Sequence, residues 1–351
     1  MRVCSLPNPL NVTVSCGVSA ALMSGLLAGT SGAIARSEQA SAEKARAPHP
    51  LSATASYAHV KYAPAPADTP VSPFTGLPGR SGDVLAVKVD NVGPARPHTG
   101  LQDADIVYVE QVEAGQSRIL AVFSSKQPSV IGPVRSARES DLELLRQFGR
   151  PALAYSGSQS ALKPLIQAAP LSPLTPDNTP KGFIRGGSRQ APHNLYVHPA
   201  EILAAAPQAD TAKDIGFRFG PAPTGGQPAS SHTVGYPAAR FTFTWSNTAR
   251  RWQISMDGNP AQTTDHGRLG ASTVVIQYTS IRPSKFKDRW GNVSPYTQTI
   301  GTGHALVLRD GKSYEARWHR PNAEEGTTFS TPTGEPMKFA PGQVWVVLAN
   351  R

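Results

Sequence analysis

Short apolar runs rich in β-branched residues constrain this chain most, because they are too short for buried helices but fit strands. Residues 84–89 (VLAVKV), 106–112 and 118–123 are three such runs, and 151–155 is a fourth. The polar segment 113–117 joins the second run to the third and predicts a hairpin. The sequence therefore predicts a buried sheet in this half of the chain.

A helix start follows the hairpin. Ser136 stands where an N-cap residue is expected, and Glu139, three residues on, completes a capping-box pattern. This pattern predicts a helix over 139–148, which Gly149 ends.

Two arginines, Arg135 and Arg138, flank the predicted helix start. Helix N-termini carry partial positive charge, and guanidinium groups match carboxylates and phosphates, so one interpretation is an anion site. The alternative is that both arginines pair with Glu110, Glu113 or Asp90 and stabilise the fold. The sequence leaves both interpretations open.

The stretch 73–206 reads as a mixed α/β domain with a central sheet and packed helices. Further helices are predicted near 162–166 and over 199–206, while 168–187 is proline-rich and irregular. Residues 207–236 are rich in Pro, Gly and Ala and have little apolar period, and we expect a linker between two domains there.

Residues 237–351 contain only strand-like runs, separated by turn pairs such as Asp257-Gly258 and Asp310-Gly311. The runs are 240–245, 251–256, 272–278, 297–300, 304–308, 314–318 and 344–348. They predict a small antiparallel all-β domain, a sandwich or a barrel, so the expected fold class is α+β.

All five tryptophans lie in this β domain. Strand alternation favours a core role for most of them over a sugar-stacking surface. Trp290, in a polar loop, is the exception.

The N-terminal segment indicates the compartment. Residues 1–35 carry one charged residue, Arg2, before a long apolar stretch that ends in a small-x-small pattern. This is typical of a signal peptide, and an uncleaved membrane anchor is the alternative. Residues 36–72 predict a disordered linker. Both cysteines, Cys4 and Cys16, lie in the first segment, so we expect an exported protein without disulfides.

The chain is basic, with 34 Lys and Arg against 24 Asp and Glu and a net charge of +10. This balance favours anionic partners. No basic run with interleaved aromatics occurs in the sequence, so nucleic acid is not expected as a partner. A membrane is expected only through the N-terminal segment, if it stays uncleaved.

Several motifs are spread over residues 73–349. They are 91–97 (NVGPARP), 104–108 (ADIVY), 113–115 (EAG), 131–138 (IGPVRSAR), 189–196 (R-x-APHNLY), 274–278 (VVIQY), 310–312 (DGK) and 342–345 (GQVW). Together they resemble the bacterial DUF3048 family, also called YerB-like lipoproteins. The resemblance implies an exported cell-envelope protein with an N-terminal mixed domain and a C-terminal β domain, and its activity is not settled. The chain departs from the family in lacking a good lipid-attachment motif.

Polar side chains recur at strand ends and loops of the first domain. Ligands of open α/β sheets bind at strand ends beside helix N-termini, and an excess of arginine suits a carboxylate or phosphate. The candidate ligand-binding residues are Asp90, Asn91, Arg96, Glu110, Glu113, Arg118, Arg135, Ser136, Arg138, Ser156, Arg189, His193, Asn194 and Tyr196.

The catalytic patterns are weaker. Ser156 and His193, with Asp90 or Glu113, supply the residue types of a hydrolytic triad, but the serine lacks the Gly-x-Ser-x-Gly frame. Glu110 and Glu113 point to opposite faces of a strand unless Glu113 lies in the turn. No catalytic residue is assigned, and no cofactor or metal site is expected.

The sequence favours a non-catalytic binding or regulatory module at the cell surface. Its ligand would be anionic, a cell-wall polymer or an envelope protein. The alternative is a hydrolase that acts on a wall glycan, peptide or ester at the same cleft.

Overall fold

The computed structural model describes residues 69–288 and 290–351, all within one compact unit. The predicted signal peptide, 1–35, lies outside these residues. Of the predicted linker only 69–72 are described, and there Val71 pairs with Pro78 across a turn. Within the described part of the chain, no helix is long and apolar enough to cross a membrane.

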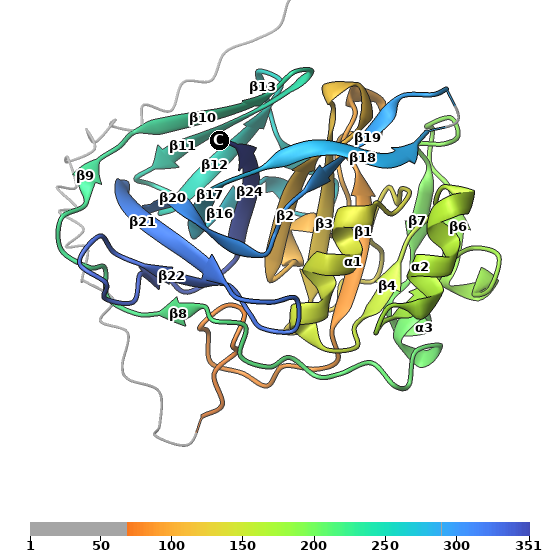
Figure 1. Cartoon of the computed structure of the whole chain (residues 1–351), viewed down its shortest axis with the longest axis horizontal. Coiled ribbons are helices and arrows are strands. Elements are labelled where there is room, and N and C mark those ends of the chain that lie inside the picture. Colours follow the sequence, from red (N-terminus) through yellow and green to blue (C-terminus); the bar gives the residue numbers. More distant parts are fainter. Residues whose placement is uncertain (1–68, 289) are drawn as a thin grey trace, which may run out of the picture. The chain divides into compact units, whose positions relative to one another are not determined.

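One mixed sheet of eleven strands organises the fold (Figure 1). Its strands are β1 Leu85–Asp90, β2 Ile106–Gln111, β3 Ser117–Phe123, β4 Ala152–Ala154, β5 Ser172–Leu174, β9 Gln227–Pro228, β17 Thr273–Thr279, β20 Gly301–Arg309, β21 Lys312–Arg320, β22 Thr328–Ser330 and β24 Val344–Asn350. The order is β22-β21-β20-β17-β24-β2-β3-β1-β4-β5, with β9 beside β21.

The four predicted runs of the first half are confirmed as β1 to β4. The hairpin is confirmed as well, since β2 and β3 pair antiparallel from Ile106 opposite Val122 to Gln111 opposite Ser117. Every residue of β1 and β3 is buried, which explains their nearly continuous apolar sequence.

The last strand, β24, lies between a strand from each half of the chain. It pairs parallel with β17 on one side and parallel with β2 on the other, so Val344 faces both Thr273 and Ile106 in register. The C-terminal strands are therefore not purely antiparallel, and that prediction is wrong. Strands of both predicted domains share one sheet, while the boundary at 207–236 stays a prediction.

A second sheet packs on one face of the first. It contains β10 Ser231–Tyr236, β11 Ala239–Ser246, β12 Arg251–Met256 and β13 Asn259–Pro260 in that order, with β16 Gly270–Ala271 beside β12. The rings of Phe241 and Phe243 contact Trp345 of β24, and their centroids lie 6.5 and 6.2 Å from the centroid of the Trp345 ring. The turn at Asp257 and Gly258 has positive φ at both residues, as a tight hairpin requires.

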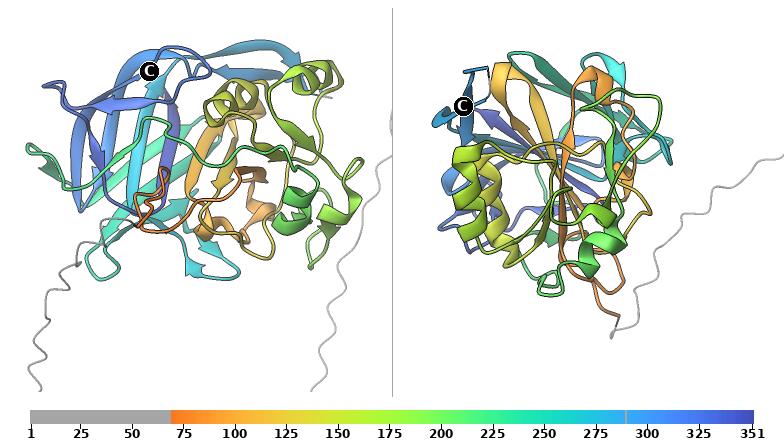
Figure 2. Two further views of the ribbon diagram at one scale, coloured as in Figure 1. Left: turned by 90° about the horizontal axis from the view of Figure 1, so that it is seen from below. Right: turned by 90° about the vertical axis from the view of Figure 1, so that its right-hand side faces the viewer.

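Short helices cover the faces of the main sheet. They are α1 Glu139–Leu145, α2 Lys163–Ala168 and α3 Pro199–Ala204. Leu144, Leu145 and Ile166 bury α1 and α2 on the face opposite the second sheet. Ile202 buries α3 on the other face, and Figure 2 (right) shows this separation.

Short connecting elements complete the fold. The two-stranded pairs are β6 Phe183–Arg185 with β7 Leu195–Val197, β8 Arg218–Phe219 with β23 Lys338–Phe339, β14 Gln262–Thr263 with β15 Gly267–Arg268, and β18 Ile281–Lys287 with β19 Val293–Thr297. The 3-10 turns are η1 Gly93–Ala95, η2 Leu101–Asp103, η3 Glu113–Gly115, η4 Arg146–Phe148, η5 Ser160–Leu162 and η6 Pro180–Gly182.

Three expectations about these connections are corrected. The segment 168–187 contains β5, which pairs with β4, and β6, which pairs with β7. The segment 207–236 contains β8 and β9, which pair with the distant strands β23 and β21, and β10, which pairs with the next strand, β11. The strand predicted at 297–300 instead ends at Thr297. Beyond it the chain leaves the pair, and Thr299 donates its backbone N–H to Glu143 of α1 at 3.0 Å.

Most of the tryptophan side chains lie in the core. Trp252, Trp318 and Trp345 are buried, which confirms the core interpretation for these three, and Trp245 is half-buried. Trp290 is 70% exposed.

Candidate functional site

Charged side chains gather on the face of the main sheet that α1 covers. Because side chains alternate along strands, Lys88 and Asp90 of β1, Glu110 of β2 and Arg118 of β3 share one face. Arg118 stands opposite Asp90 in one ladder and opposite Glu110 in the other. The strand ends thus bring together residues that lie far apart in sequence.

The deepest group is a lysine between two carboxylates. Lys88 contacts Glu110, and its Nζ lies 2.6 Å from Asp141 Oδ1. All three side chains are at most 3% exposed. Burial raises the pKa of Glu110, and the neighbouring Asp141 acts in the same direction against the attraction of Lys88. Glu110 is therefore a buried ion-pair partner rather than a lining residue of a cleft.

Sequence reasoning missed Lys88 and Asp141. The signal was present, since Lys88 is the one charged residue inside the apolar run 84–89. A charge within a buried strand requires a partner.

The start of α1 differs from the prediction. The N-cap is Arg138, not Ser136, and Asp141 Oδ2 accepts the Arg138 backbone N–H at 2.7 Å. Glu139 does not take part, because its carboxylate accepts a hydrogen bond from Ser284 of β18. The seven-residue helix thus has an acidic side chain on the N–H that was expected to meet an anion.

Arg138 pairs with Glu113, as the structural alternative predicted. Its Nη2 and Nε lie 2.6 and 3.0 Å from Glu113 Oε2, and Ser294 of β19 donates to Oε1. Burial acts to raise the pKa of Glu113, but the hydrogen bonds and charge of Arg138 outweigh it and lower the pKa. Glu113 lies in the turn η3, so it does not oppose Glu110 across the strand.

Arg135 and His193 share Asp90. Arg135 Nε lies 3.2 Å from Asp90 Oδ2, and His193 Nδ1 lies 2.8 Å from the same oxygen. The carboxylate is 1% exposed, whereas the arginine and histidine side chains are 25% and 22% exposed. The buried Asp90 carboxylate therefore orients the partly exposed side chains of Arg135 and His193.

Arg118 differs from the other two arginines. It is 7% exposed, and its Nη1 donates to the Ser136 carbonyl at 3.2 Å. Among the described residues it has no ion pair, and its buried Nε, like that of Arg135, has no hydrogen-bond partner. Burial lowers the pKa of Arg118 to about 10, and the neighbouring Arg138 and Arg135 act in the same direction. The charges of Asp90 and Glu113, which form no ion pair with Arg118, act against them.

The predicted triad is only half assembled. His193 and Asp90 meet, but Ser156 Oγ lies 3.4 Å from Ser136 Oγ, and within the described residues no hydrogen bond joins Ser156 to His193. The backbone keeps the two serines together, since Ser156 N–H donates to the Arg135 carbonyl. Two hydroxyls therefore lie beside the arginines without a base.

A second group surrounds the motif 91–97. Arg96 donates to the side chain and the carbonyl of Asn91 and pairs with Asp257 at 2.8 Å. Asn91 donates in turn to Ser117 at 2.9 Å. Arg96 lines a pocket of about 270 Å³ between this motif and residues 256–262. Its guanidinium is already occupied by protein acceptors.

His98 is a further residue that the sequence interpretation missed. It is 1% exposed, and its Nε2 lies 2.8 Å from the Asp90 carbonyl. Burial lowers its pKa to about 4, so the imidazole is neutral at pH 7.

The remaining candidates stabilise the loop that carries His193. Arg189 donates to the Tyr196 hydroxyl and to the Pro97 carbonyl, while Asn194 accepts from Arg185 at 2.8 Å. These contacts tie the loop to the motif 91–97, so a positioning role fits Arg189, Asn194 and Tyr196.

Two further features lie apart from these residues. Asp103, Asp265 and His266 bring their ligand atoms within 4.8 Å of one another, but Asp265 and His266 are exposed and His266 already bonds to Asp103.

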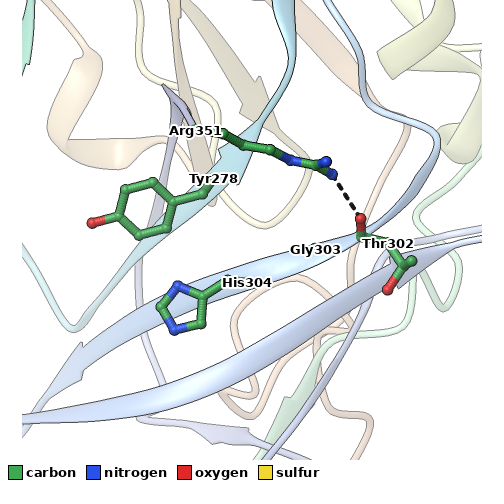
Figure 3. Close-up of a pocket in the computed structure, with 5 residues that line it drawn as sticks. All are labelled: Tyr278, Thr302, Gly303, His304 and Arg351. Atoms are coloured by element: carbon green, nitrogen blue, oxygen red, sulfur yellow. Dashed lines mark hydrogen bonds between the residues drawn. The ribbon is translucent and has the colours of Figure 1, made fainter.

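Figure 3 shows a separate open pocket of about 530 Å³. There the rings of Tyr278 and His304 stack with centroids 5.5 Å apart, and Arg351 donates to the Thr302 carbonyl at 2.9 Å. None of the sequence-predicted residues lines it.

Fold and site together define a β-rich protein with a shared central sheet and an arginine-rich group at its strand ends. Two family models match this chain, described as Protein of unknown function (DUF3048) N-terminal domain over residues 74–212 and C-terminal domain over residues 232–346. The chain belongs to the DUF3048 family, as its motifs indicated.

A relative from Bacillus subtilis (strain 168), named "Putative lipoprotein YerB", is 29% identical over 276 residues. The match covers 75% of this chain and 80% of the relative. The crystal structure of the YerB protein from Bacillus subtilis superposes with a TM-score of 0.68 at 23% identity, over 80% of this chain and 96% of that chain. This likeness establishes a common fold.

Proposed function

We propose that this chain is an exported, non-catalytic binding module of the bacterial cell envelope and that it recognises an anionic group at Arg118. The name of the lipoprotein relative supports the envelope location, and so does the apolar N-terminal segment. The net charge of +10 supports an anionic partner.

The uncompensated charge of Arg118 is the observation that carries this proposal. Taking a guanidinium out of water is costly unless an anion or several acceptors compensate it. Arg118 has one hydrogen bond to a neutral carbonyl and no carboxylate within ion-pair distance among the described residues. A bound oxyanion would supply the missing charge.

The neighbouring ion pairs distinguish Arg118 from the other two arginines. Arg135 and Arg138 each have one carboxylate, Asp90 and Glu113 respectively. Arg118 is therefore the one of these three guanidinium groups that has no carboxylate in ion-pair contact. The Ser136 and Ser156 hydroxyls next to it offer neutral donors to the same ligand.

A hydrolase is the second candidate, favoured by the His193–Asp90 pair. A buried carboxylate on Nδ1 leaves Nε2 available as a general base. The weakness of this candidate is the nucleophile, because Ser156 bonds to Ser136 and a water would have to serve.

The test is to titrate the full chain with isolated cell-wall polymers and to analyse the bound material for cleavage products. We expect Arg118→Met to weaken binding about tenfold to a hundredfold, the loss typical of one charge-assisted hydrogen-bonded contact. Arg146→Met is the matched control, because Arg146 is an exposed arginine paired with Glu324. Equal binding by all three proteins would refute the proposal, and products that disappear in His193→Gln would favour the hydrolase.

A further inference from the structure

The β18–β19 hairpin lies beside the group of Arg118, Arg135 and Arg138, which we call the arginine site, and hydrogen bonds hold it there. Ser294 of β19 donates to Glu113, the partner of Arg138, and accepts from Gln159 at 2.9 Å. On its far end, Thr297 N–H donates to Ser140 of α1 at 2.9 Å. The hairpin is therefore anchored to the same turn and helix that hold the arginines.

The turn of this hairpin is internally bonded. Asp288 Oδ1 accepts the backbone N–H of both Trp290 and Asn292 at 2.9 Å, and Oδ2 accepts the Asn292 side chain. The Asp288 backbone N–H also donates to the Asn292 carbonyl at 2.8 Å. Such a turn holds the backbone of Trp290 in one conformation, which lowers the entropy lost when the indole meets a ligand.

Trp290 is the most exposed large apolar side chain among the described residues, at 70%. The charge of Arg138 reaches the same turn, because it helps to lower the pKa of Asp288 together with the hydrogen bonds from Asn292 and Trp290, against desolvation. An exposed indole thus lies in the turn of the hairpin that Ser294 anchors to Glu113, the partner of Arg138.

We propose that Trp290 is the stacking residue of the arginine site and that the ligand is an anionic glycan, a saccharide chain that carries carboxylate or phosphate groups. This inference rests on the proposed function. The arginines would take the anionic group, while the flat indole would pack on the apolar face of a neighbouring sugar ring. Trp is also among the residue types enriched where a few side chains dominate binding.

The experiment uses the full chain and three probes. Inorganic phosphate carries the charge without a ring, peptide-free peptidoglycan strands carry carboxylates on sugar rings, and vesicles of anionic phospholipid carry charge on an apolar surface. Calorimetry measures affinity for the wild type, Trp290→Ala, Trp290→Phe and Arg118→Met. Tryptophan emission reports contact at Trp290 when the change seen in the wild type is absent from Trp290→Phe, because Trp252, Trp318 and Trp345 are buried and Trp245 is common to both proteins.

We expect Trp290→Ala to weaken binding of the glycan strands at least about tenfold, while phosphate affinity stays unchanged and Trp290→Phe stays close to the wild type. Equal glycan affinity in Trp290→Ala, with loss in Arg118→Met, would overturn this inference and leave the proposed function intact. Loss of vesicle binding without loss of glycan binding would overturn it in favour of a membrane contact. If the wild type binds neither phosphate nor glycan, both proposals fail.

Discussion

Replacing Lys88 by methionine would expose the cost of the buried charges beneath the site. In the wild type the ammonium group contacts two carboxylates, those of Glu110 and Asp141, and none of the three side chains is more than 3% exposed. Methionine fills a similar volume without the charge, so two buried carboxylates would face each other with no cation. Breaking a buried ion pair in this way costs about 3–5 kcal/mol of unfolding free energy.

The assay is urea unfolding of the full chain, followed by circular dichroism. Arg146→Met is the control, because the Arg146–Glu324 pair is 44% and 61% exposed, and we expect it to cost about 0–1 kcal/mol. Since Lys88→Met could unfold outright, a triple variant adds Glu110→Leu and Asp141→Asn. The asparagine keeps an acceptor for the Arg138 N–H, and we expect the triple variant to recover most of the loss.

A loss in Lys88→Met no greater than in Arg146→Met would refute this reasoning. It would mean that the lysine contributes no more than a surface charge, and that the two carboxylates find other partners.

Two buried titratable groups predict opposite pH dependences of stability. Burial lowers the pKa of His98 from 6.5 to about 4, so the unfolded state binds the proton at a higher pH than the folded state does. The unfolding free energy therefore falls as the pH falls from about 6.5 to 4, by up to about 3 kcal/mol. His98→Gln should remove this dependence, and unfolding free energies measured from pH 4 to 7 that run parallel to the wild type would contradict it. Asp105 has its pKa raised from 3.8 to about 6, chiefly by burial, so stability is lost as pH rises through that window, by up to about 3 kcal/mol. Asp105→Asn should therefore gain on the wild type as pH rises from 4 to 6, and a constant difference over that range would count against the raised pKa.

Local sequence was a good guide to the strands but not to their partners. The runs that became β1, β2 and β3 carry their own β-branched, apolar pattern, and the 113–117 turn fixes the hairpin between two of them. The central place of β24 could not be read locally, because its pairing with β2 joins residues more than two hundred positions apart. Nothing in the sequence near Val344 specifies that partner.

The sequence indicated several residues that lie together at the strand ends, but not which of them pair. Asp90, Arg135 and His193 do come together, but Arg138 pairs with Glu113 and the capping role passes from Ser136 to Arg138. Pairing depends on which carboxylate the tertiary fold brings near, and sequence spacing does not carry that information.

The sequence placed Arg118 among the candidate ligand-binding residues, but it did not show that Arg118 differs from Arg135 and Arg138 in having no carboxylate in contact. In the fold it is the one of Arg118, Arg135 and Arg138 that has no carboxylate in ion-pair contact. The account of this protein as a binder depends on that difference.

The most direct test is the unfolding free energy of Arg118→Met beside the wild type, with and without inorganic phosphate. If Arg118 awaits an anion, removing its buried charge should leave the phosphate-free protein at least as stable as the wild type, and phosphate should stabilise the wild type alone. If the variant is instead less stable by about 1–3 kcal/mol and phosphate stabilises both proteins equally, Arg118 is a structural residue and the account is contradicted.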